Sequence, residues 1–107
     1  MKKFIAVIVV LCAVMITSSA SAAKGVVVFY GERSKKIIIE TGWQRYTCGE
    51  VMGITIHLHR GDEVAGELES SGSHELYNIT EDETFSVWIS DYWLSKERAL
   101  EWLERNS

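Results

Sequence analysis

Two histidines at alternate positions are the residues whose type and spacing could do chemistry. His57 and His59 lie in residues 51–60, a segment that alternates apolar and polar side chains. Alternate residues of a strand project to the same side, so the two imidazoles form a pair of the kind that binds metals. A three-residue loop at 61–63, in which Gly61 or Asp62 would supply the positive φ that such loops commonly need, would place Glu67 opposite His57 as a third ligand. The sequence therefore predicts a zinc or copper site at His57, His59 and Glu67, although a solvated polar strand face gives the same pattern without a metal.

The tripeptide Arg60, Gly61 and Asp62 follows directly, and it has the form of a cell-adhesion motif. The same loop would expose it at a turn, as an adhesion ligand requires. Gly and Asp also favour turns for local reasons, because Gly adopts positive φ and Asp bonds its own backbone. Adhesion and an ordinary strand connection are both open hypotheses.

One modification signal is present. Asn78, Ile79 and Thr80 form an N-x-T sequon, which is glycosylated only in an exported chain and a competent host. Asn78 shares a strand face with Leu76, so the pattern leaves its exposure undecided.

Catalytic signatures are weak. Residues 70–74 place three serines beside His74, yet catalytic triads are assembled across space. The chain has no G-x-S-x-G elbow, no phosphate-binding glycine loop and no Cys-x-x-Cys pair. We expect a protein that is not an enzyme and uses no cofactor. A small hydrolase is a further alternative, which a contact between a serine and a histidine would favour.

The first 22 residues predict the compartment. Residues 2 and 3 are lysines, an apolar run covers residues 4–16, and Ala20, Ser21 and Ala22 satisfy the small-x-small rule for signal peptidase. We expect a signal helix at 1–22, cleavage after Ala22, and a secreted, periplasmic or cell-surface protein.

Two alternatives to cleavage are open. Residues 4–23 carry no charge and are just long enough to span a bilayer, so the segment could stay as a membrane anchor. Cys12 lies in the apolar run, where a lipoprotein would carry its lipid. Leu11 before it is too bulky for the usual lipidation signal.

After cleavage, 85 of the 107 residues remain, which is enough for one small domain at 23–107. Loss of two lysines leaves nine basic and 15 acidic residues and a net charge of −6. Phosphate binding needs clustered Lys and Arg, so this balance argues against nucleic acid or anionic lipid as a partner. Cys48 is then the one remaining cysteine. It is either buried and inert or paired with another molecule.

Short β-rich segments follow one another at even spacing, with turns made by Gly, Asn, Asp and Ser. This rhythm is typical of an all-β sandwich or barrel, and we expect a small antiparallel β-sandwich of jelly-roll type. Residues 43–47 extend the second segment or form a strand of their own. The expected strands cover residues 24–30, 35–40, 51–60, 63–70, 74–79 and 84–89.

A short helix is expected to close the chain. Ser95 can cap it, and Ala99, Leu100 and Leu103 recur at helical spacing. An isolated helix this short is marginal in water, so it must dock on the sheet. The apolar side chains expected to help are Trp93, Leu94 and Trp102.

Aromatic residues are the best candidates for a binding surface, because Trp and Tyr anchor protein interfaces. The mature domain carries four Trp and four Tyr. A protein partner or self-association is the function we expect of them. The candidate binding residues are Trp43, Tyr46, Trp88, Tyr92 and Trp93.

Residues 54–88 carry a family resemblance. An alternating strand is followed by Gly61-Asp62-x-Val64-x-Gly66, by Ser70-Ser71-Gly72, by Tyr77 and by Phe85-x-Val87-Trp88. This arrangement resembles the β-sandwich of GOLD-type domains and of small exported prokaryotic proteins of similar build. The resemblance implies a compact sandwich that binds other proteins without catalytic residues. The helix expected after Trp88, where the family continues with strands, implies either a shortened version of the domain or a truncated sequence.

Overall fold

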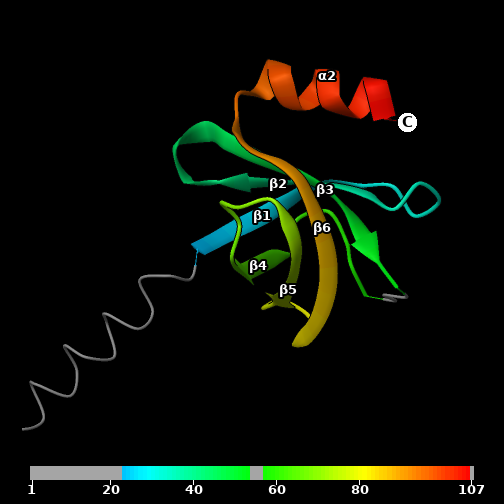
Figure 1. Cartoon of the computed structure of the whole chain (residues 1–107). Coiled ribbons are helices and arrows are strands. Elements are labelled where there is room, and N and C mark those ends of the chain that lie inside the picture. The colour runs from blue at the N-terminus through cyan, green and yellow to red at the C-terminus, as the bar shows by residue number, and fades with distance from the viewer. Residues whose placement is uncertain (1–22, 54–56, 107) are drawn as a thin grey trace, which may run out of the picture.

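The computed structural model describes residues 23–53 and 57–106, apart from the side chain of Trp43. The expected signal helix and its cleavage site lie outside the described residues. Among the residues described, no helix is both long and apolar enough for a membrane crossing. The elements are β1 (Ala23–Tyr30), β2 (Lys36–Thr41), a 3₁₀ turn (Gly42–Gln44), β3 (Arg45–Met52), β4 (Glu63–Gly66), β5 (Gly72–Asn78), β6 (Glu83–Leu94) and α2 (Lys96–Asn106) (Figure 1).

The strands form one antiparallel sheet that closes on itself in the order β1-β2-β3-β6-β5-β4. Because β4 returns to pair with β1 after the β1–β3 meander, the first four strands make a Greek key. The prediction of a mainly β protein with a C-terminal helix is confirmed. The prediction of a two-sheet sandwich is wrong, since the sheet closes into a barrel.

Bulges and glycines make this closure possible. β1 contains a bulge with one extra residue, at Val28, and β6 contains two extra residues between Ile89 and Leu94. These bulges bend the two strands. Gly49 of β3 lies directly against the backbone of Trp88, where a side chain would not fit. The alternation of inward and outward residues is the same in a sandwich and in a barrel, so periodicity alone could not separate them.

Two apolar clusters fill the domain. The first fills the barrel and includes Ile37 and Ile39 of β2. The second lies between the barrel and α2 and includes Ile38, Cys48 and Trp102. Three consecutive isoleucines are buried because β2 is covered on both sides, by the barrel interior on one and by the helix on the other.

Five of the six expected strands are confirmed with different bounds, whereas the one expected at 51–60 is wrong, because of its described residues only Val51 and Met52 belong to a strand, the end of β3. Residues 57–62 form a loop instead. Ile54 and Ile56 lie outside the described residues. Leu58 is buried while His57 and His59 are exposed, as the alternation predicted. β6 is longer than expected, because it continues past Ile89 through its bulges.

The C-terminal helix lies against the outer side of β3 and the end of β6 (Figure 1). Ser95 caps it, as predicted, by accepting a hydrogen bond from the Arg98 amide at 3.3 Å. Trp102 docks the helix, and Leu94 packs against the same cluster. The prediction for Trp93 is wrong, since half of its surface is exposed.

Candidate functional site

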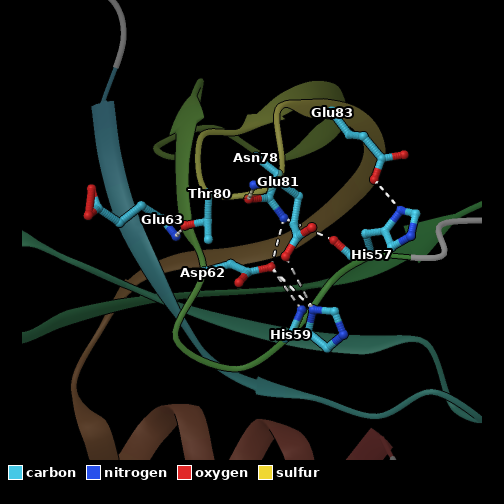
Figure 2. A network of polar contacts seen from close by, with 8 residues as sticks. All are labelled: His57, His59, Asp62, Glu63, Asn78, Thr80, Glu81 and Glu83. Carbon is cyan, nitrogen blue, oxygen red and sulfur yellow. Dashed lines mark hydrogen bonds and ion pairs between the residues drawn. The ribbon is translucent and has the colours of Figure 1, made fainter.

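A polar network joins the β3–β4 loop to the β5–β6 turn, as Figure 2 shows. The loop turns at residues 59–62, where the Asp62 amide donates to the His59 carbonyl at 3.1 Å. Gly61, the third residue of this turn, has φ +98°, a conformation that glycine adopts without strain. The prediction that Gly61 or Asp62 supplies a positive φ is therefore confirmed for Gly61.

Asp62 is the buried centre of the network. Its Oδ2 atom accepts hydrogen bonds from the His59 amide and from Asn78 Nδ2, each at 2.9 Å. Only 5% of the residue is exposed, whereas Arg60 and Gly61 are open to solvent. The expectation of an exposed tripeptide is wrong for Asp62, the residue whose carboxylate an adhesion receptor would have to reach.

Asn78 connects the two halves of the network. Its side-chain nitrogen also donates to the His57 carbonyl at 3.2 Å, and its oxygen accepts from the Glu81 amide at 3.1 Å. It is 1% exposed and shares its buried face with Leu76. A glycan on Asn78 would replace one of the two N–H donors of its side chain and would have no room at this buried position, so the folded domain offers no accessible acceptor there.

The candidate metal ligands separate in the structure. β4 pairs with β1 and β5, so the hairpin that would bring Glu67 opposite His57 does not form. His57 Nδ1 lies 2.8 Å from Glu83 Oε2. His59 Nδ1 instead lies 3.9 Å from Asp62 Oδ2 and 3.7 Å from Glu81 Oε2.

His59, Asp62 and Glu81 thus place three ligand-type atoms within 4.8 Å of one another. Sequence reasoning missed Asp62 and Glu81 as neighbours of His59. Asp62 belongs to the candidate adhesion tripeptide, and Glu81 belongs to a turn that only the barrel brings to this loop. Nothing local in the sequence signals that approach.

Ser70 and His74 do make contact. Ser70 Oγ lies 2.9 Å from His74 Nε2, and the Ser70 carbonyl oxygen lies 3.1 Å from the same nitrogen. A carbonyl oxygen accepts hydrogen bonds and cannot donate them, so this pairing requires the proton to be on Nε2. An imidazole protonated there cannot take the serine proton, and the contact is best explained as closure of the β4–β5 loop.

Three candidate binding residues lie in β6 and face solvent: Trp88, Tyr92 and Trp93, which we call the aromatic surface. Trp88 is 51% exposed and Trp93 50%, values unusual for the largest apolar side chains. Tyr46 of β3 is half-buried. The side chain of Trp43 lies outside the described residues.

Trp93 has a backbone conformation that is rare for its type. Its φ is +60°, within the bulged part of β6, and the left-handed region is an outlier for a bulky residue. The Arg45 guanidinium lies 5.7 Å from the centre of the indole ring. A cation–π contact of this kind stabilises an exposed ring by about 0.5–1 kcal/mol.

A groove of about 350 Å³ runs between α2 and the barrel. Its walls are mainly apolar, and Tyr46 and Lys96 also line an adjoining polar hollow. The apolar lining consists of Val28, Phe29, Ile38, Ala99, Leu100 and Leu103.

Comparison with known proteins places this chain in no family: no family model matches it, and neither does any curated protein or solved structure.

Proposed function

We propose that this chain is exported, loses residues 1–22, and acts as a small non-catalytic module that binds a protein. The binding site is the aromatic surface, Trp88, Tyr92 and Trp93. The bound protein is a partner or a second copy of the chain. The exposure and the amphipathic character of these side chains suit an interface anchor.

The conformation of Trp93 is the observation that carries the proposal. A residue held in a sparsely populated region of φ and ψ costs about 1–3 kcal/mol, and such residues cluster at functional sites. Burial does not offset this cost here, because half of the Trp93 residue surface is exposed. The strain has its simplest explanation if the bulge presents the ring to a partner.

The start of the barrel supports the proposal of export. Ala23, the residue after the expected cleavage site, already pairs with Gly66 in the β1–β4 ladder. A domain that begins at residue 23 agrees with this pairing. The resemblance of residues 54–88 to GOLD-type domains, which bind other proteins, stays a prediction and agrees with this function.

Photo-crosslinking tests the aromatic surface directly. A benzoylphenylalanine is introduced at position 88, 92 or 93 of the full chain in cells that produce it, and the products are sized by mass spectrometry after irradiation. We expect one discrete adduct, at twice the mass of the chain for self-association or at another fixed mass for a partner. Intact mass of the same material reports whether residues 1–22 are removed.

Tyr77 and Leu100 provide matched controls, because both are exposed and lie outside the aromatic surface. The probe at these two positions should give no adduct of that mass. Absence of an adduct from all three aromatic positions would refute the proposal, and so would an equal yield from Tyr77 and Leu100.

A further inference from the structure

We propose that His59, Asp62 and Glu81 bind a divalent transition-metal ion of the zinc class. The site differs from the one expected at His57, His59 and Glu67, since only His59 belongs to both. It shares no residue with the aromatic surface, so either proposal can fail without the other. One imidazole and two carboxylates are a donor set that zinc accepts, with a fourth position open to water.

The distances between the donor atoms suit such an ion. Bonds of about 2.1 Å in tetrahedral geometry separate neighbouring ligand atoms by about 3.4 Å. His59 Nδ1 lies 3.7 Å from Glu81 Oε2 and 3.9 Å from Asp62 Oδ2. Because the three ligand atoms lie within 4.8 Å of one another, no pair has to approach by more than about 1.4 Å to close the site. The side chains of His59 and Glu81 are 60% and 32% exposed and have room to move.

The third ligand is held in place in advance. Asp62 Oδ2 accepts two N–H bonds, which fix the orientation of the carboxylate and leave the lone pairs of Oδ1 for a metal. Asn78, which supplies one of these bonds, also accepts a bond from the Glu81 amide. One buried side chain therefore positions both carboxylate residues, and partners that orient ligands in this way raise metal affinity.

The charges in the network also favour a cation. The carboxylate atoms of Asp62 and Glu81 lie within 4.8 Å of each other, and like charges this close repel. Among the described residues, His59 makes the ion-pair contacts to both carboxylates. With a neutral imidazole the three side chains carry a net charge of −2, which a divalent ion would neutralise.

Zinc chloride titrated into the purified full chain, followed by calorimetry, tests the site. We expect saturable binding of one Zn²⁺ per chain. His59→Gln and Glu81→Gln should each weaken binding at least about tenfold. At the same zinc concentration the Tm of the parent protein should also rise more than that of His59→Gln, because stabilisation by a ligand grows with its affinity for the folded state.

His57→Gln and Glu67→Gln are the matched controls, since both residues are exposed and neither belongs to the proposed site. Both variants should bind Zn²⁺ like the parent. Circular dichroism of each variant checks that the barrel is folded. Three outcomes would overturn the proposal. These are no saturable binding by the parent, an unchanged Zn²⁺ affinity in His59→Gln, or a loss of Zn²⁺ affinity in Glu67→Gln that Glu81→Gln does not show.

Discussion

Burial decides what single side chains of this protein can do. Cys48 has no exposed surface and no disulfide partner in the described chain, and it packs with Ile38, Ala99 and Trp102. Burial, and then the negative charge of Asp91, raises the pKa of the Cys48 thiol from 9.0 to about 12. The thiolate is the reactive form, so the folded domain keeps this cysteine inert. Of the two sequence hypotheses, the buried cysteine is confirmed.

The raised pKa of Cys48 predicts a loss of stability at alkaline pH. Above about pH 9 the unfolded chain releases the thiol proton while the folded chain retains it until about pH 12. The contribution of Cys48 to the free energy of unfolding should therefore be fully present below this window and fall within it by about 1.4 kcal/mol per pH unit. Urea denaturation at pH 7, 9 and 10.5 measures the slope.

Cys48→Ala is the control for this prediction, because it removes the titrating group from both states. Its free energy of unfolding should fall less steeply above pH 9 than that of the parent. The pKa values of Tyr30 and Tyr46 are also raised, chiefly by burial, so a smaller slope in the same direction should remain. Equal slopes for the variant and the parent would contradict the assignment to Cys48.

At the scale of elements, close backbone approach at glycine controls how β3 and β6 pair. A Cβ atom on Gly49 would clash with the carbonyl oxygen of Trp88, and backbone cannot yield as a flexible side chain would. Gly49→Ala should therefore lower the free energy of unfolding by about 1–3 kcal/mol or more. Urea denaturation followed by tryptophan fluorescence measures the change.

Gly42 is the matched control, since a Cβ added there meets no atom within 4 Å. Gly42→Ala should leave the free energy of unfolding within about 0.5 kcal/mol of the parent. Similar losses for the two variants would show that the clash at Gly49 is not the cause.

The docking of α2 gives a second prediction at this scale. Trp102 is 6% exposed between the helix and the barrel, whereas Leu100 is 52% exposed. Trp102→Ala should lower the free energy of unfolding by about 3–5 kcal/mol, and Leu100→Ala should lower it by less than about 0.5 kcal/mol. Urea denaturation measures both changes. A larger effect for Leu100 would mean that the helix presents a different face to the barrel.

At the scale of the whole molecule, closure of the sheet links every strand to two neighbours. The helix shares its apolar cluster with β2 and β3, so it has no separate core. We expect a single cooperative unfolding transition, as is usual for small domains. Far-UV circular dichroism and tryptophan fluorescence should give coincident urea curves. A loss of the helical circular dichroism signal at a lower urea concentration than the fluorescence change would contradict a single transition.

The sequence by itself determined the local properties of the chain. Strand segments, the Ser95 cap and the positive φ at Gly61 followed from short-range periodicity and backbone sterics, which depend only on neighbouring residues. The alternation also placed Leu58 inside and His57 and His59 outside correctly.

The tertiary structure alone decided closure and the grouping of polar residues. The alternation of apolar and polar residues is compatible with a sandwich and with a barrel. Bulges such as those in β6 leave no clear pattern in composition. Asp62 and Glu81 meet His59 because β4 pairs with β1 and β5 rather than with β3. Contacts between distant segments depend on the register of the whole sheet, and no short window of sequence contains that information.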